Sequence, residues 1–165
     1  MELYIRQKVF SWGDRFTVKD ADGIDCYVVE GEVFSFGKKL HVYDMEGREL
    51  AYIEQQLFTF LPRYRVYIGG CETAEIVKEF SLFTPRYRAE GLGWEIQGEF
   101  FSHEYEILSG GCCIASISKE WMTWGDSYAL HILSPDDELT ALAVVLAIDA
   151  ATENKGGASV TFSGN

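Results

Sequence analysis

Long hydrophobic runs and prolines are both scarce in this sequence. The longest apolar run covers residues 141–148, far short of the roughly 20 residues that a membrane-spanning helix needs, so we expect no transmembrane segment. Three prolines stand against sixteen glycines, a ratio that favours tight turns between short strands. Hydrophobic residues reach 47% and aromatic residues 15% of the 165 residues. This composition excludes a disordered chain and suits one folded domain.

Basic residues are also few. Lys and Arg total 14 against 26 Asp and Glu, so the formal net charge is −12. An acidic surface repels phosphates, which disfavours non-specific binding to nucleic acid and to anionic lipid, so we expect no nucleic-acid partner. A charge of this size also keeps a protein soluble. Only a local cluster of basic residues could make the electrostatic potential positive on part of the surface.

Residues arranged for known chemistry are missing as well. The three histidines stand apart without the spacing of a zinc site, and there is neither a G-x-S-x-G elbow nor a glycine-rich phosphate loop. Cys112 and Cys113 follow a Gly-Gly turn and could mimic a nucleophile, but nothing marks a base partner. Glu104 and Glu106 share a strand face and are interpreted as solvated carboxylates. We therefore predict no enzymatic activity, no metal and no cofactor.

The four cysteines contain no C-x-x-C pair. We interpret them as free thiols of a reducing compartment. Met1-Glu2-Leu3-Tyr4 leads directly into alternating strand sequence, so we expect no signal peptide. Together these features predict a cytoplasmic protein.

Twelve short segments rich in Val, Ile, Tyr and Phe alternate apolar and polar residues and are separated by turn signals such as Asp22-Gly23 and Gly69-Gly70. This cadence predicts an all-β sandwich or barrel. The predicted strands cover 3–10, 15–19, 26–32, 39–44, 49–57, 63–68, 73–80, 86–90, 94–100, 105–108, 112–120 and 127–133.

The strands fall into two similar halves, about 3–68 and 73–133. Gly47, Ala51 and Ile53, for example, recur 64 positions later as glycine, alanine and isoleucine. A shorter pattern, aromatic-x-[Asp/Pro]-[Arg/Ser]-aromatic, occurs four times, at 12–16, 60–64, 83–87 and 124–128. We interpret the repeat as structural: Asp or Pro shapes each turn, and the flanking aromatics pack across the end of the hairpin.

The C-terminal segment predicts a helix over 136–153. Ser134 is the expected N-cap, Pro135 occupies the first helical position, and acidic residues follow at the positive end of the dipole. Residues 139–151 are apolar on every side apart from Thr140 and Asp149, and a helix that is apolar all round must be buried all round. We therefore expect it to fill a barrel, giving one domain over 1–153 and a flexible tail over 154–165.

Four segments carry a resemblance to a known family: 7–16, 33–40, 115–121 and 142–150. Together they resemble the LURP-one-related (YxjI-like) family over about residues 3–152. That family shares its fold with the C-terminal domain of tubby proteins and is related to phospholipid scramblases. The resemblance implies a twelve-stranded closed β-barrel around a hydrophobic helix and no established reaction. Tubby relatives bind phosphoinositides through clustered basic residues, and no cluster here matches theirs position by position.

Three pairs of basic residues share a strand face by period-two alternation. If their strands are neighbours, they form one cationic patch suited to phosphate or a lipid head group. The alternative is that acids on adjacent strands, at 54, 75, 90 and 95, neutralise them. The candidate contacts are Arg6, Lys8, Arg63, Arg65, Arg86 and Arg88.

A barrel filled by its own helix leaves no internal chamber, so any site lies on the outer surface or at the rims. The first hypothesis is a non-enzymatic binding or interaction module with an unknown protein or lipid partner. The alternative is a peripheral phospholipid-binding, scramblase-related module that acts through the paired basic residues. A third hypothesis, an enzyme with a rim site, requires a deep polar pocket with perturbed pKa values.

Overall fold

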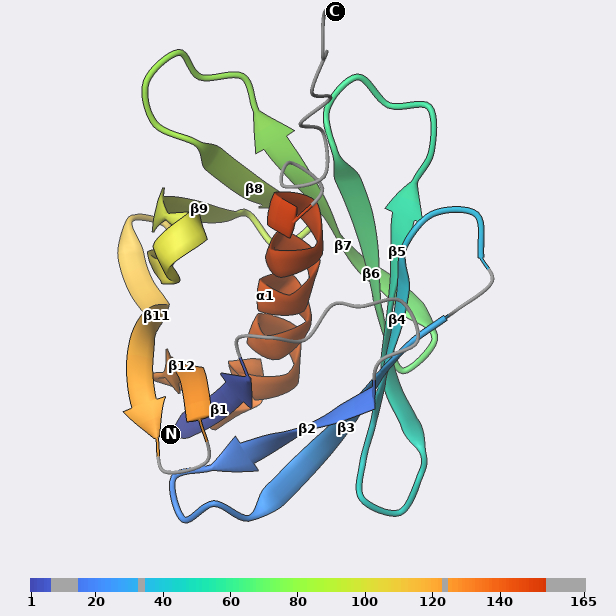
Figure 1. The fold of residues 1–165 in the computed structure, drawn as a ribbon. Helices are drawn as coiled ribbons and strands as arrows, with labels where there is room; N and C mark the ends of the chain where they lie inside the picture. The colour runs from blue at the N-terminus through green and yellow to red at the C-terminus, as the bar shows by residue number, and fades with distance from the viewer. Residues whose placement is uncertain (7–14, 33–34, 123–124, 154–165) are drawn as a thin grey trace, which may run out of the picture.

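The fold is a closed antiparallel barrel of twelve strands, seen in a computed structural model that describes residues 1–6, 15–32, 35–122 and 125–153. Each strand pairs with the next along the chain, and β12 pairs with β1 to close the barrel (Figure 1). The predicted fold class is confirmed. The strands are β1 (Glu2–Arg6), β2 (Arg15–Asp20), β3 (Asp25–Gly31), β4 (Lys39–Tyr43), β5 (Glu49–Gln56), β6 (Arg63–Ile68), β7 (Cys71–Glu79), β8 (Arg86–Glu90), β9 (Trp94–Glu99), β10 (Glu104–Ser109), β11 (Cys112–Met122) and β12 (Gly125–Ile132).

The C-terminal helix α1 (Glu138–Glu153) fills the barrel. Residues 141–151 are all buried, including Asp149 at 5% exposure, as the all-round apolar pattern predicts. The helix starts differently from the expectation. A 3-10 turn, η2 (Pro135–Asp137), precedes it, and the Ser134 side chain makes no capping hydrogen bond. At the other end, the carbonyl of Ala150 accepts hydrogen bonds from Lys38 Nζ at 2.9 Å and from the Tyr64 hydroxyl at 3.1 Å.

The ladder between β1 and β2 is short. Strand β1 pairs with β12 at five positions, from Glu2 opposite His131 to Arg6 opposite Ser127. It pairs with β2 at only two positions, Leu3–Asp20 and Tyr4–Lys19. Beyond Tyr4 the two strands therefore separate, and the outer wall between them opens into a wedge.

The connections alternate between two ends of the barrel, because every strand is antiparallel to its neighbours. Connections that follow even-numbered strands lie at the end where α1 begins, which we name the turn end. Connections that follow odd-numbered strands lie where α1 finishes, which we name the loop end (Figure 1). A further short 3-10 turn, η1 (Phe100–Ser102), joins β9 to β10 at the loop end.

Two expectations about organisation stay predictions: the correspondence between the two halves and the boundary of a flexible tail. All four cysteines are free, as expected, with Cys26 half-buried and the others exposed. Within the residues described, no helix is both long and apolar enough to cross a bilayer.

Candidate functional site

The predicted arginine pairs lie on the outer face of the barrel. Arg63 and Arg65 belong to β6, Arg86 and Arg88 to β8, and β7 lies between the two strands. In the register of the sheet, Arg63 and Arg88 flank Val77 from opposite sides. The structure therefore brings these two pairs onto one region of the wall.

Acids on β7 and β8 offset most of this charge. Glu75 and Glu90 were expected partners; Glu72 and Glu79 were not. Among the residues described, Arg86 has no ion-pair partner. As contacts for an anion, the four arginines stay a prediction. The ion pairs are Arg63–Glu75 at 3.5 Å, Arg65–Glu72 at 3.9 Å, Arg88–Glu79 at 3.5 Å and Arg88–Glu90 at 3.6 Å.

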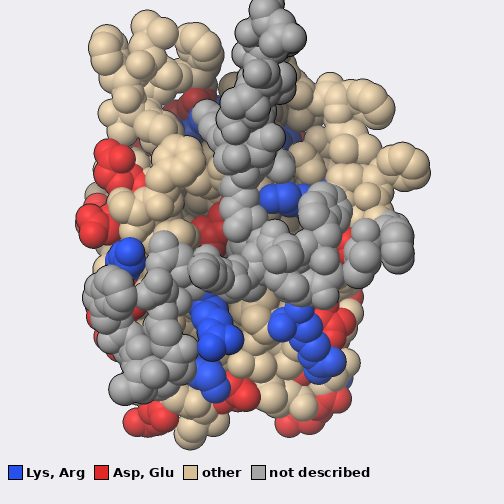
Figure 2. All heavy atoms as spheres, viewed as in Figure 1, with Lys and Arg blue, Asp and Glu red and all other residues tan. Residues whose placement is uncertain are grey.

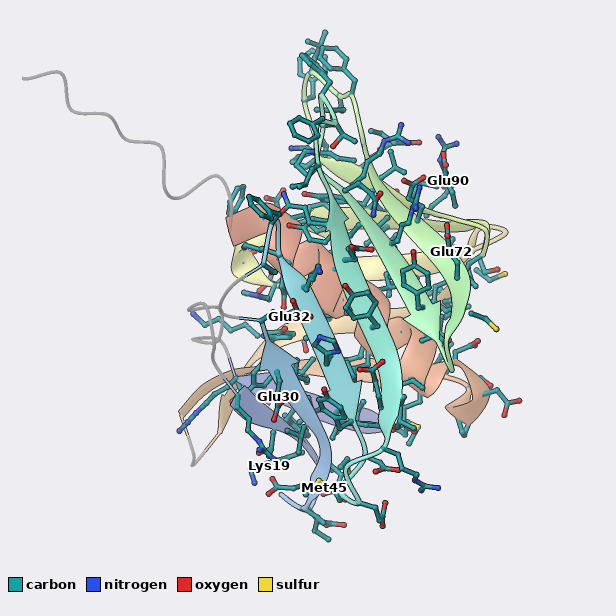
Figure 3. The ribbon with its side chains drawn as sticks, turned by 90° about the vertical axis from the view of Figure 1, so that its right-hand side faces the viewer. Lys19, Glu30, Glu32, Met45, Glu72 and Glu90 are labelled. Atoms are coloured by element: carbon teal, nitrogen blue, oxygen red, sulfur yellow. The ribbon has the colours of Figure 1, made fainter. Side chains whose placement is uncertain are left out.

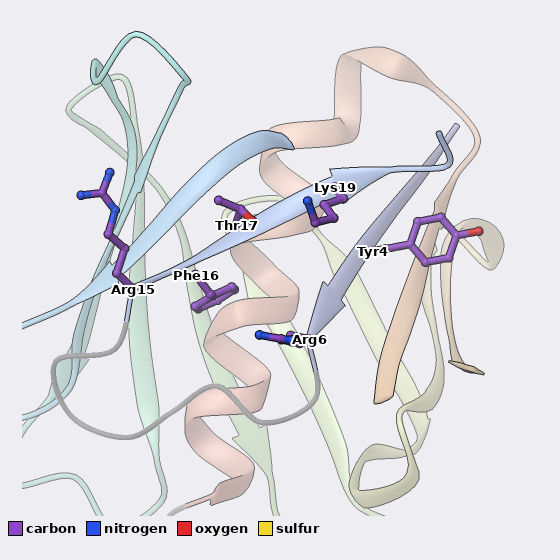
Figure 4. Close-up of a pocket in the computed structure, with 6 residues that line it drawn as sticks. All are labelled: Tyr4, Arg6, Arg15, Phe16, Thr17 and Lys19. Carbon is purple, nitrogen blue, oxygen red and sulfur yellow. The ribbon is translucent and has the colours of Figure 1, made fainter. Parts of the chain in front are cut away.

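The third predicted pair is divided. Arg6 lies at the end of β1, on the opposite side of the wedge from β2, whereas Lys8 lies outside the described residues. Arg6 lines a pocket of about 390 Å³ in this wedge, together with Tyr4, Arg15, Phe16, Thr17 and Lys19 (Figure 4). Sequence reasoning missed the contribution of β2, because the pocket exists only where the β1–β2 ladder stops.

Arg15 and Lys19 of this wedge pocket each form an ion pair with a carboxylate of β3. Arg15 lies 3.1 Å from Glu30, and Lys19 lies 2.5 Å from Asp25. The hydrogen bond from Lys19 and a second one from Thr17 lower the pKa of the Asp25 carboxyl. Glu30 and Asp25 thus offset the charges of Arg15 and Lys19 on this part of the wall.

Exposed apolar side chains gather at the loop end. Eight large apolar residues on the connections after β3, β5, β7 and β9 are between 43% and 104% exposed. The loops after β5 and β7 project from the barrel. Their surface is uncharged in Figure 2 and carries several rings at the top of Figure 3. We name this set the aromatic rim: Phe36, Leu57, Phe58, Phe60, Phe80, Leu82, Phe83 and Phe101.

The aromatic rim corrects one expectation about the repeated motif. Phe60 and Phe83 were expected to pack across the ends of their hairpins, but they are 96% and 95% exposed. The second aromatics of the same copies, Tyr64 and Tyr87, are 1% and 4% exposed. The last ladder pair of the β5–β6 hairpin is Gln56–Arg63, so Phe60 lies beyond the sheet with no cross-strand neighbour to pack against.

The two projecting loops share a composition. Residues 57–62 read Leu-Phe-Thr-Phe-Leu-Pro and residues 80–85 read Phe-Ser-Leu-Phe-Thr-Pro, with no charge in either; each is followed by an arginine. Phe58 also has a left-handed backbone, with φ of 62°, which is uncommon for a bulky residue and marks a position worth a functional explanation.

A buried polar cluster lies inside the barrel towards the loop end. The Tyr128 hydroxyl donates a hydrogen bond to Asp149 Oδ2, and His103 Nε2 lies 3.6 Å from Asp149 Oδ1. The ring of His103 stacks on Tyr128 with centroids 4.3 Å apart. Burial lowers the pKa of His103, so its imidazole is neutral near pH 7. Burial, with the charge of Asp149, raises the pKa of Tyr105 well above its usual value. The hydrogen bond between Tyr128 and Asp149 thus connects α1 to strand β12 of the barrel wall.

A second arrangement that the sequence concealed spans β1, β12 and β11 on the outer face. His131 Nδ1 lies 3.0 Å from Glu2 Oε1, and His131 Nε2 lies 3.2 Å from Ser118 Oγ. The order carboxylate, imidazole, hydroxyl is that of a catalytic triad. Ser118 is nevertheless a mid-strand residue in a regular ladder opposite Ala129, not the exposed apex of a strained turn.

The fold and these surfaces define a class of protein: a small barrel filled by its own C-terminal helix, with its candidate sites outside the barrel wall. A family model described as LURP-one-related matches residues 1–149, and the chain belongs to this family. The resemblance read from the sequence is thereby confirmed.

Two further comparisons agree. The chain is 37% identical over 160 residues to the uncharacterised protein YxjI of Bacillus subtilis, covering 97% of this chain and 99% of that one. An X-ray structure of a protein from Arabidopsis thaliana is similar with a TM-score of 0.58 and 15% identity, covering 88% of each chain. This second likeness supports the fold alone.

Proposed function

We propose that this protein is a non-enzymatic binding module that docks onto the surface of a phospholipid membrane through its aromatic rim. The observation that carries the proposal is the near-complete exposure of Phe58, Phe60 and Phe83 on two neighbouring loops at one end of the barrel. Monomeric proteins rarely leave apolar side chains grouped in this way without a use for them.

The shape of the rim favours a membrane over a protein partner. Its side chains project from separate loops (Figures 1 and 3), whereas a protein interface core is a contiguous, closely packed patch. A lipid interface accepts a group of side chains carried on separate loops, because each apolar side chain can enter between the head groups on its own. Each phenylalanine that becomes fully buried contributes about 1.5–3 kcal/mol, so a few of them suffice for reversible docking.

The mechanism differs from the one that the basic pairs suggested. Arg63, Arg65 and Arg88 have carboxylates within ion-pair distance, and the net charge of −12 opposes attraction to an anionic surface. Docking driven by apolar insertion therefore needs no anionic lipid and responds weakly to salt. Binding through the arginines would instead require anionic lipid and would weaken steeply as salt rises.

Vesicle co-sedimentation tests the proposal. We expect the protein to bind vesicles of pure phosphatidylcholine, and the bound fraction to change little when salt rises from about 0.05 to about 0.5 M. The triple variant Phe58→Ser, Phe60→Ser, Phe83→Ser is expected to lose most of this binding. Its unfolding midpoint should match the wild type, because the three side chains have almost no contacts to lose.

The matched control replaces apolar residues of the turn end that are also exposed. Ile24, Met45 and Leu133 are 61%, 49% and 75% exposed, and their triple serine variant is expected to bind like the wild type. No binding to any vesicle, or equal losses in the two triple variants, would overturn docking through the rim.

A further inference from the structure

A groove on the outer wall lies directly beside the aromatic rim. It has a volume of about 740 Å³ and crosses the wall from β8 to β12. Its lining at the loop end includes Thr84, which follows Phe83 of the rim, and Glu104, which begins β10 just after η1. The loop after β7 and η1, which carries Phe101 of the rim, lie on the same side of the barrel (Figure 1). We infer that this groove binds the head group of phosphatidylethanolamine, an inference that rests on the membrane docking proposed above.

The groove has one available arginine. Among the described residues that line it, Arg86 is the only lysine or arginine, and its exposed side chain forms no ion pair with them or with the rest of the described chain. Glu79 lies opposite Arg86 in the ladder with β7, but its carboxylate pairs with Arg88 at 3.5 Å. The guanidinium of Arg86 presents parallel N–H donors that match two oxygens of a phosphate. It is therefore the contact for the phosphate of the head group.

Two carboxylates lie across the groove from this arginine. Arg86 and Glu106 flank Gln97 from opposite sides in the ladders of β9, so their Cα atoms are about 10 Å apart. Glu104 lies two residues from Glu106 on the same face of β10. Both glutamates are exposed, and neither forms a hydrogen bond or an ion pair within the part of the chain that the structure describes. A phosphate joined to an ammonium by a short linker fits between the arginine and these carboxylates.

The donors and acceptors of the groove favour ethanolamine over choline. A primary ammonium donates three hydrogen bonds, which Glu104 and Glu106 can accept. The quaternary ammonium of choline donates none and binds best against exposed aromatic rings. Tyr105 is the one phenylalanine, tyrosine or tryptophan among the described lining residues, and it is only 3% exposed. The imidazole of His131 already has a hydrogen-bond partner at each nitrogen.

The same lining disfavours anionic head groups. A serine head group adds a carboxylate, which the two glutamates repel, and a glycerol head group has no ammonium for them to bind. A zwitterion with a primary ammonium satisfies all three charged side chains of the groove.

The position of the groove along the barrel suits a docked rim. Arg86 follows Phe83 by three residues, which corresponds to about 10 Å of extended chain. Apolar groups that bind a membrane interface enter it by about 5–10 Å. When Phe83 is inserted to that depth, Arg86 lies at the level of the lipid phosphates, and the groove faces the head groups.

The first test is a titration of the full chain followed by amide NMR, with glycerophosphoethanolamine and glycerophosphocholine as probes. The ethanolamine probe is expected to shift amides of β8, β9 and β10 in a saturable way and to bind about threefold more tightly than the choline probe. Arg86→Gln and Glu106→Gln should each weaken its binding about threefold. The matched controls, Arg48→Gln and Glu46→Gln, change an exposed ion pair of the turn end and should bind like the wild type.

Three results would overturn the groove as a binding site: shifts that grow linearly without saturation, equal affinity for the two probes, or equal weakening in the turn-end controls. Well-dispersed spectra of each variant establish that it is folded.

Vesicles then separate the groove from the docking. Phosphatidylethanolamine added to phosphatidylcholine vesicles is expected to raise the bound fraction of the wild type. Because lipid composition also affects the insertion of apolar side chains, Arg86→Gln is the comparison: it should bind pure phosphatidylcholine normally and lose most of the increase. The rim triple variant should lose binding to both vesicles and keep its binding of glycerophosphoethanolamine.

The two proposals fail in different ways. Vesicle binding by the wild type with no greater increase than in Arg86→Gln would overturn the groove and leave the docking intact. An absence of binding to any vesicle would overturn the docking, and saturable binding of glycerophosphoethanolamine would then exclude a membrane lipid as the source of the head group.

Discussion

The turn end and the loop end of this barrel are made of opposite kinds of connection. At the turn end, short glycine-containing turns are closed by their own side chains: Asp44 Oδ1 accepts hydrogen bonds from the amides of Glu46 at 3.0 Å and Arg48 at 2.8 Å. In the described part of the loop end, longer connections carry phenylalanines whose side chains are exposed to solvent instead of packed in the barrel. The connections of the turn end are stabilised by contacts within the chain, whereas those of the loop end expose apolar surface that is available to a binding partner.

Replacing a glycine by alanine at each end tests how tightly the backbone is constrained there. The largest expected change in the free energy of unfolding comes from this comparison. Gly98, near the loop end, has φ of 139°, and an added Cβ would lie 2.6 Å from the Glu104 carbonyl oxygen and from Tyr105 Cα. Gly110, at the turn end, has φ of 56° and no atom within 4 Å of an added Cβ. Gly98→Ala should cost more than about 4 kcal/mol, and Gly110→Ala about 1–2 kcal/mol.

Urea unfolding of the two variants measures this difference. Equal costs would mean that the close β9–β10 approach at Gly98 relaxes freely, and that the loop end is as adaptable as its exposed tips.

The sequence predicted the framework well because the framework follows from local patterns. Period-two alternation located all twelve strands, and the all-round apolar pattern of 139–151 placed the helix inside the barrel. Boundaries moved where no side chain signals them: β7 begins at Cys71 instead of Thr73, and η1 was not foreseen.

The candidate sites were harder to predict because they depend on register and on where a ladder stops. Nothing in the alternation of β2 shows that Arg15 and Lys19 border an opening. The contact of His131 with Glu2 and Ser118 joins residues far apart in sequence. The motif copies did point to Phe60 and Phe83, but a pattern of residue types does not distinguish a packed aromatic from an exposed one.

A smaller effect is expected from pH, through the imidazole enclosed near the loop end. Burial lowers the pKa of His103, so the unfolded chain, with a His pKa near 6.5, takes up the proton first. Protonation of this residue therefore does not affect the free energy of unfolding above about pH 6.5, and it destabilises the fold as the pH falls below that value. His103→Gln should reduce the loss of stability between about pH 7.5 and 5.5.

His41 provides a control of opposite sign. Burial alone would lower its pKa, but hydrogen bonds with Glu32 and Glu49 outweigh this effect and raise it. Its contribution to stability is present below about pH 6.5 and is lost as the pH rises. His41→Gln should therefore enlarge the loss on acidification. Urea midpoints at the two pH values compare the variants, and the same response from both would contradict the assignment of His103 as buried and neutral.

The smallest expected effect concerns Ser118, where the geometry imitates an active site. Glu2, His131 and Ser118 are connected in the order of a triad, and hydrogen bonding with Tyr4, followed by the charge of His131, lowers the pKa of Glu2. Catalysis also needs donors aimed at the developing oxyanion, but the backbone around Ser118 is engaged in the β11–β12 ladder. A fluorophosphonate probe should therefore label wild type and Ser118→Ala equally weakly. Labelling that disappears in Ser118→Ala would show an activated nucleophile on the outer wall, and the proposal of a non-enzymatic module would fail.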